Sequence, residues 1–200
     1  MKKLLSLLIL VSFTIKAQDV KIGTQTWTSK NLDVSTYRNG DKIPQVQDKK
    51  AWANLKTGAW CYYENRAANG TKYGKLYNWY AVIDPRGLAP KGYHIPTDAE
   101  WTMLTDYLGG DSMAGKKMKS TSGWKNNGNG TNSSGFNGLP GGYRGSYGDF
   151  NGIGFVGFWW SSSEGNTNDA WYRFLLNDAG NVDRDGGSKR GGFSVRCVKD

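Results

Sequence analysis

The clearest hydrophobic pattern in the chain lies in the segment Thr97–Leu108. Trp101, Leu104 and the last residue of the segment recur at spacings of three and four, which places them on one face of an α-helix. Thr97 and Glu100 have the spacing of a capping box, in which each side chain binds the backbone amide of the other. Two glycines follow directly and favour the end of a helix. The pattern predicts an amphipathic helix of about three turns.

Short segments rich in β-branched and aromatic residues lie on both sides of this helix and predict strands. A second short helix is predicted over Lys75–Val82, and Gly123–Gly138 is expected to be a long loop held to the body by Trp124 and Phe136. Strands joined by turns dominate the second half, which favours an α+β domain with an antiparallel sheet, one or two helices and long loops. The predicted strands are Val20–Ile22, Thr26–Trp27, Asn31–Tyr37, Ala59–Tyr63, Phe155–Ser163, Ala170–Leu176, Asn181–Arg184 and Phe193–Val198.

The N-terminal residues have the pattern of a secretory signal peptide. Lys2 and Lys3 precede the apolar run Leu4–Ile15, which is short for a membrane span, and polar sequence follows. We therefore predict a signal peptide over residues 1–17 and a single domain over residues 18–200. The protein is expected to be secreted, periplasmic or on the cell surface, and not embedded in the membrane. An uncleaved membrane anchor is the alternative.

Removal of this leader changes the charge. The formal net charge is +9, and the loss of three lysines takes Lys and Arg from 26 to 23 against 17 acidic residues, which leaves +6. The remaining cations are scattered, so an exported protein of this kind is not expected to bind nucleic acid. Attraction to an anionic cell-surface polymer and simple solvation of the surface are the two explanations left open.

The two cysteines, Cys61 and Cys197, are an even number in a chain predicted to reach an oxidising compartment. This favours one disulfide between an early strand and the last strand. Two separate buried thiols are the alternative, since free cysteine is often buried.

Several motifs spread over nearly the whole mature chain resemble those of the Fibrobacter succinogenes major paralogous domain, a family of secreted bacterial proteins. The resemblance implies a C-type-lectin-like fold, shared distantly with formylglycine-generating enzymes and sulfatase-modifying domains. Family members often carry a further cysteine pair, and here its positions lie near Asn69 and at Ala89. The motifs that carry the resemblance are Ile22–Trp27, Asn31-Leu32, Asn39–Pro44, Tyr73–Tyr80, Gly92–Trp101, Gly138–Arg144, Trp159–Ser163 and Gly192–Val198.

Candidate catalytic and metal-binding residues are few. His94 is the only histidine, and nothing near it in sequence supplies a nucleophile, so a structural hydrogen bond is expected there. The copper-binding cysteine pair of the formylglycine-generating enzymes has no counterpart in Ser161–Leu176. Asn181–Gly186 matches the first half of a calcium loop, but Gly192 stands where a bidentate Glu belongs. We therefore predict no metal, no cofactor and no catalytic residue.

Aromatic residues are the remaining candidates for function. The chain has 9 Trp and 11 Tyr, and Trp159 and Trp160 are adjacent in a predicted strand. Neighbouring strand residues face opposite sides, so at most one of the two is expected to be fully buried. Exposed rings suit sugar stacking or protein contact. The candidate binding residues are Trp159, Trp160, Tyr143, Arg144 and Trp171.

These observations favour a secreted, non-catalytic recognition or cell-surface module that contacts polysaccharide or an envelope protein. The alternatives are an enzyme or enzyme accessory on a sulfatase-modifying-like scaffold, and a purely structural envelope protein. Acidic residues gathered in one concave pocket would favour an enzyme. A shallow surface with exposed aromatic rings would favour a binding module.

Overall fold

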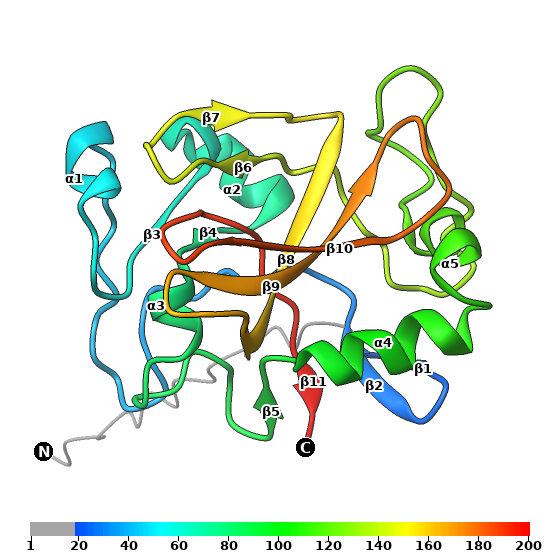
Figure 1. Ribbon diagram of the computed structural model, residues 1–200, viewed down its shortest axis with the longest axis horizontal. Helices are drawn as coiled ribbons and strands as arrows, with labels where there is room; N and C mark the ends of the chain where they lie inside the picture. The colour runs from blue at the N-terminus through cyan, green and yellow to red at the C-terminus, as the bar shows by residue number, and fades with distance from the viewer. Residues whose placement is uncertain (1–18) are drawn as a thin grey trace, which may run out of the picture.

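A four-stranded antiparallel sheet joins the beginning and the end of the described chain. The computed structural model describes residues 19–200, so the predicted signal peptide at residues 1–17 lies outside it. The strand order is β1-β2-β11-β5, and β11 pairs with both β2 and β5. Figure 1 shows these strands together at the lower edge of the molecule. The strands are β1 Asp19–Ile22, β2 Gln25–Thr28, β5 Tyr93–His94 and β11 Val198–Lys199.

The β1–β2 hairpin was predicted from the sequence and is confirmed. Val20 pairs with Trp27 across it, and the turn between the strands contains Gly23 at φ 61°. Glycine adopts this left-handed conformation without the steric cost that a side chain would add. The hairpin buries Trp27 completely and so fixes one wall of the core.

A three-stranded antiparallel sheet, in the order β10-β9-β8, forms the centre of the molecule (Figure 1). Residues on β8 and β9 pair directly, for example Phe158 with Phe174 and Trp160 with Tyr172. Two short two-stranded sheets, β3–β4 and the β6–β7 hairpin, lie outside the two larger sheets. The bounds are β3 Trp60–Cys61, β4 Leu76–Tyr77, β6 Tyr143–Arg144, β7 Phe150–Asn151, β8 Val156–Glu164, β9 Asp169–Leu176 and β10 Asp183–Ser188.

The predicted central helix is present as α4, Asp98–Tyr107, with Thr97 as its N-cap and Leu108 as its C-cap. The capping box forms as the spacing predicts: the amide of Glu100 donates to the Thr97 hydroxyl at 3.2 Å, and the amide of Thr97 donates to the Glu100 carboxylate at 2.8 Å. Trp101 and Leu104 are fully buried. The helix packs on β8 and β9 and crosses the front of the molecule in Figure 1.

The other helices are short. The predicted helix over Lys75–Val82 is correct only in its second half, because residues 76–77 form β4 and pair with β3. The helix that follows the two glycines after α4 was not predicted. The remaining helices are α1 Lys49–Ala53, a 3-10 turn Tyr63–Asn65, α2 Ala67–Tyr73, α3 Trp79–Val82 and α5 Asp111–Met118.

The core divides into clusters that cover both faces of the central sheet. One cluster contains Trp160, Tyr172 and Phe193, and a second contains Trp159, Trp101 and Trp27. Trp124 and Phe136 are buried in the second cluster, which confirms that they hold the long loop to the body. The fold is therefore a mixed α and β domain with several small antiparallel sheets. No helix within residues 19–200 is long and apolar enough to cross a bilayer.

Candidate functional site

Four aromatic rings gather on the face of the central sheet that α4 does not cover. Phe158 and Phe174 lie opposite each other on β8 and β9, with ring centroids 5.2 Å apart. The ring of Tyr172 lies 5.2 Å from Phe158 and 5.8 Å from Phe174. Phe158 and Phe174 are half-buried, so part of each ring meets solvent. We call Tyr143, Phe158, Tyr172 and Phe174 the aromatic surface.

Tyr143 reaches the aromatic surface from the β6–β7 hairpin. Its ring stacks on Phe158 with centroids 4.7 Å apart and an interplanar angle of 17°. The alternation of side chains along β6 points Arg144 to the opposite side, where it is fully buried. The Arg144 guanidinium donates to the carbonyl groups of Val46 and Gln47 at 2.7 and 2.9 Å. Arg144 thus fixes the hairpin on which Tyr143 is carried.

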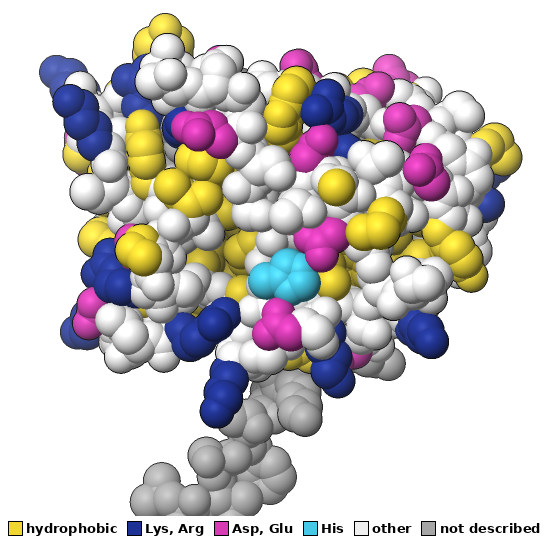
Figure 2. Space-filling model, turned by 60° about the horizontal axis from the view of Figure 1, so that its bottom comes forward, with side chains coloured by type: hydrophobic (Ala, Val, Ile, Leu, Met, Phe, Trp, Pro, Cys, Tyr) yellow, Lys and Arg dark blue, Asp and Glu magenta, His cyan; other side chains and the backbone are white. Residues whose placement is uncertain are grey.

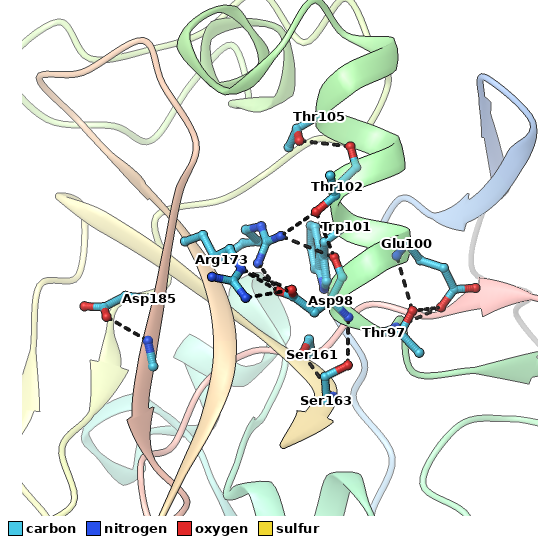
Figure 3. A network of polar contacts seen from close by, with 12 residues as sticks. Thr97, Asp98, Glu100, Trp101, Thr102, Thr105, Ser161, Ser163, Arg173 and Asp185 are labelled. Carbon is cyan, nitrogen blue, oxygen red and sulfur yellow. Dashed lines mark hydrogen bonds and ion pairs between the residues drawn. The ribbon is translucent and has the colours of Figure 1, made fainter. Parts of the chain in front are cut away.

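An acidic group borders the aromatic surface. The Tyr172 hydroxyl donates to Oδ2 of Asp185 at 3.4 Å, and the Asp185 side chain is exposed. Burial, together with the charge of Asp185, raises the pKa of Tyr172 to about 12. The hydroxyl therefore stays protonated at neutral pH and remains a donor. Figure 3 shows Asp185 on the side of β10 that points away from α4.

The opposite face of the same sheet is joined to the start of α4 by ion pairs. Arg173, which is buried, donates to Oδ1 of Asp98 at 2.5 Å, and Arg184 donates to Oδ2 of Asp98 at 2.9 Å. Partial burial alone would raise the pKa of Asp98, but hydrogen bonds from Arg184 and Arg173 outweigh it and hold the pKa below its ordinary value. The Ser163 hydroxyl accepts the backbone amide of Asp98 at 3.0 Å (Figure 3). This network positions the helix on the sheet.

Trp171 lies on this α4 side and not at the aromatic surface. Its register partner is Gly186, and the guanidinium of Arg184 stacks over its ring at 3.5 Å from the centroid. Trp171 is half-buried. The structure therefore separates two of the predicted binding residues, since Tyr143 and Trp171 belong to opposite faces of the central sheet.

A profile of one protein family matches residues 20–199, nearly the whole described chain. The family is described as the Fibrobacter succinogenes major domain. The chain belongs to this family. No curated protein and no solved structure matches it.

Trp159 and Trp160 were predicted to bind a ligand, with at most one of the two fully buried. This prediction is wrong, because both are buried. Trp159 is 1% exposed and Trp160 is not exposed at all. They do face opposite sides of β8, but each side is covered: the Trp159 indole donates to Oδ1 of Asn31 at 2.9 Å, and the Trp160 indole donates to the carbonyl of Tyr77 at 2.9 Å. Arg144, 1% exposed, is likewise unavailable to a ligand.

The predicted disulfide between Cys61 and Cys197 is also wrong. Both cysteines are free thiols, each with no exposed surface. Cys61 lies in the small cluster with Trp52 and Leu76, whereas Cys197 lies in the cluster with Trp160. Burial raises the pKa of each thiol to about 12. Thiols in this state are unreactive toward oxidants and metals.

His94 makes the structural hydrogen bonds that the sequence predicted. Its Nε2 lies 2.7 Å from Oε1 of Glu100, and its Nδ1 lies 2.8 Å from Oδ1 of Asp200. Figure 2 shows this histidine at the surface between two acidic side chains. The nearby hydroxyl of Ser162 donates to the carbonyl of Ile95. Both ring nitrogens therefore contact carboxylates.

The half-matching calcium loop forms a strand. Within Asn181–Gly186, residues from Asp183 onward belong to β10, and Gly186 pairs with Trp171. The side-chain amide of Asn181 donates to Asp183 at 2.5 Å. Among residues 19–200, no three His, Cys, Asp or Glu side chains gather closely enough to hold a metal ion.

Four residues of the aromatic surface and its border were not predicted from the sequence: Phe158, Tyr172, Phe174 and Asp185. A signal for them was present. In β9 the aromatic residues Tyr172 and Phe174 alternate with Arg173, and alternation in a strand places the two aromatic rings on one face. The tryptophans, which offer the largest rings, lie mainly in the core of this chain.

Proposed function

We propose that this protein is a non-catalytic recognition module and that its aromatic surface binds polysaccharide. The observation that carries the proposal is the joint position of four aromatic rings and the Asp185 carboxylate on the side of the central sheet away from α4, where Tyr143, Phe158 and Phe174 are half-buried and Tyr172 keeps 9% of its surface exposed. Aromatic rings offer flat apolar contact area with few rotatable bonds. The C–H faces of a pyranose ring match such a surface, and a carboxylate accepts hydrogen bonds from sugar hydroxyl groups.

The position of the rings on a sheet supports recognition of a fixed ligand shape. Phe158 and Phe174 lie on paired strands, and Tyr143 is held by a hairpin in which the Arg144 guanidinium donates to four carbonyl groups. Rigid elements hold a binding site in place better than mobile loops do. The aromatic surface therefore needs little ordering when a ligand arrives, which lowers the entropic cost of binding.

We also propose that the module acts outside the cytoplasm and that its fold is C-type-lectin-like. Lys2, Lys3 and the apolar run Leu4–Ile15 support export. The pairing of β2 with β11, which brings the two ends of the domain together beside a central antiparallel sheet, supports the fold assignment. The cysteines give no support to export, since they are not paired.

A glycan-binding screen of residues 18–200 tests the proposed function, with Asp185→Asn and Tyr172→Phe as variants. Both substitutions nearly keep the size of the side chain: Asp185→Asn removes the negative charge beside the rings, and Tyr172→Phe removes the hydroxyl that donates to Asp185. We expect wild-type protein to bind one class of neutral polysaccharide, and each variant to bind it about 10- to 100-fold more weakly, as the loss of one hydrogen bond to a charged group predicts. Absence of glycan binding, or a protein ligand that competes for the same face, would contradict the proposal.

A further inference from the structure

A pocket of about 400 Å³ lies on a different part of the molecule and shares no residue with the aromatic surface. It is formed by the segment after β2, the end of α2 and the long loop, and its lining includes Lys30, Asn31, Lys72, Tyr73 and Asn137. Lys30 and Lys72 are exposed. The ammonium group of Lys72 lies 5.0 Å from the ring of Tyr73. Two cations therefore line a hollow large enough for one sugar ring.

The one acidic residue in the lining is already paired. Asp33 receives a hydrogen bond from Nζ of Lys75 at 2.6 Å, and the Lys75 side chain is 3% exposed. The Lys75 ammonium also lies 4.5 Å from the ring of Trp60, which holds it in place. Because the buried Lys75 ammonium compensates the charge of the Asp33 carboxylate, the positive charges of Lys30 and Lys72 are left without an acidic partner in the lining.

A third cation lies under the pocket. Arg196 is fully buried, and its guanidinium donates to Oδ1 of Asn31 at 2.7 Å and to the carbonyl of Asn137 at 3.0 Å. Its other hydrogen bonds go to the carbonyl groups of Thr28 and Phe136, so within residues 19–200 it has no carboxylate partner. Carbonyl dipoles solvate a buried charge but do not neutralise it. Burial lowers the pKa of Arg196 to about 9, which leaves it protonated at neutral pH.

The lining also offers a hydrogen-bond donor. The side-chain amide of Asn137 makes no hydrogen bond within residues 19–200, and its backbone is held at φ 54° by the Asn132 side chain, which accepts its amide at 2.7 Å. Asn31, by contrast, uses its amide on the carbonyl of Tyr73 and on Ser194. Asn137 can therefore donate to a ligand without breaking an existing contact.

From the three uncompensated cations around this pocket we propose a second binding site, specific for the anionic group of an acidic saccharide. The carboxylate of a uronic acid and the sulfate of a sulfated sugar share the required chemistry. Lys30 and Lys72 contact the anion, Asn137 donates to it, and the field of Arg196 favours it from below. That the anion is carried by a saccharide rests on the proposed function; that the pocket takes an anion does not.

Titrations of residues 18–200 followed by NMR test this site, with glucuronate, glucose 6-sulfate, inorganic sulfate and neutral glucose as probes. The variant is Lys30→Ala/Lys72→Ala, and the matched control is Lys91→Ala, an exposed lysine outside the pocket. We expect at least one acidic sugar to bind at 50 mM salt, with at least tenfold weaker binding in the double variant. We expect less than a twofold change in the control and a clear loss at 500 mM salt, since charge contacts are screened.

The probes distinguish a carboxylate ligand from a sulfate ligand, and they test the pocket independently of the aromatic surface. Tighter binding of glucuronate or of glucose 6-sulfate identifies a carboxylate or a sulfate. Equal binding of neutral glucose, or unchanged binding in Lys30→Ala/Lys72→Ala, overturns the site. Inorganic sulfate bound as tightly as both acidic sugars would show an adventitious ion only. Tyr143→Ala should leave this binding intact, so a failure of the aromatic surface and a failure of the pocket give different results.

Discussion

At the scale of single residues, the start of α4 depends on a cap made by two neighbouring side chains and on one buried tryptophan, Trp101. Thr97 and Glu100 form the capping box because both partners lie within one turn. Trp159 and Trp160 were assigned wrongly because alternation along a strand says that two neighbours face opposite sides. Alternation does not say that both sides are covered. The disulfide prediction was wrong for a related reason, because the distance between Cys61 and Cys197 depends on contacts between residues far apart in the chain.

Two substitutions at the start of α4 should lower the stability by different amounts. Thr97→Ala should lower the free energy of unfolding by about 1 kcal/mol, the usual cost of losing an N-cap. Trp101→Ala should lower it by about 3–5 kcal/mol, the usual cost of truncating a buried tryptophan. Trp101 has no exposed surface, and its ring lies 4.8 Å from that of Trp27 and 5.8 Å from that of Phe136. Urea denaturation of both variants measures the difference, and equal small losses would contradict the packing described for Trp101.

At the scale of elements, the strands with strong alternation of apolar and polar residues were predicted well. Elements that contain glycines in close contact with the rest of the chain were not. β8 and β9 lie within one or two residues of the expected bounds. β10 begins later than expected and includes Gly186 and Gly187, which pair with Trp171 and Ala170 on β9. α5 was missed because it contains Gly115, and a Cβ there would lie 2.1 Å from the carbonyl oxygen of Asn181. The close approach of this loop, not helix propensity, explains the glycine.

The second prediction concerns the contact of β5 with α4 and the last residue through His94. Partial burial alone would lower the pKa of His94, but hydrogen bonds to Asp200 and Glu100 outweigh it and the net pKa is raised above 6.5. The charged form is thus favoured in the folded state. The resulting stability is fully present below pH 6.5 and is lost as the pH rises through the raised pKa. Because the His94 side chain is 38% exposed, the loss should be about 0.5–1 kcal/mol.

Urea denaturation measures this contribution. Wild-type protein and His94→Gln are compared at one temperature from about pH 5.5 to about pH 8.5, a range that spans the titration of histidine. The variant keeps one amide group that can donate to a carboxylate and cannot titrate. We expect wild-type stability to fall with rising pH relative to the variant. Parallel curves for the two proteins would show that His94 gives no pH-dependent stability.

At the scale of the whole molecule, the central sheet separates two different surfaces. The face toward α4 is closed by the helix and by the Asp98, Arg173 and Arg184 network (Figure 3). The other face carries the aromatic surface, of which the sequence analysis identified only Tyr143. The family and the mixed α and β class could be predicted, because they rest on motifs and on element order. The composition of the candidate site could not, because it depends on which face of the sheet a helix covers.

The affinity of Phe174→Ala for the polysaccharide class found in the screen tests the central claim most directly. Tyr107→Ala is the matched control, since Tyr107 is 66% exposed and lies on α4, away from the aromatic surface. Isothermal titration should show binding weakened about 10-fold or more in Phe174→Ala, as expected for a loss of 1–3 kcal/mol of stacking and apolar contact, and unchanged in Tyr107→Ala. Both variants should keep the folded circular dichroism spectrum. Equal affinity in wild-type protein and folded Phe174→Ala would contradict the assignment of polysaccharide binding to the aromatic surface.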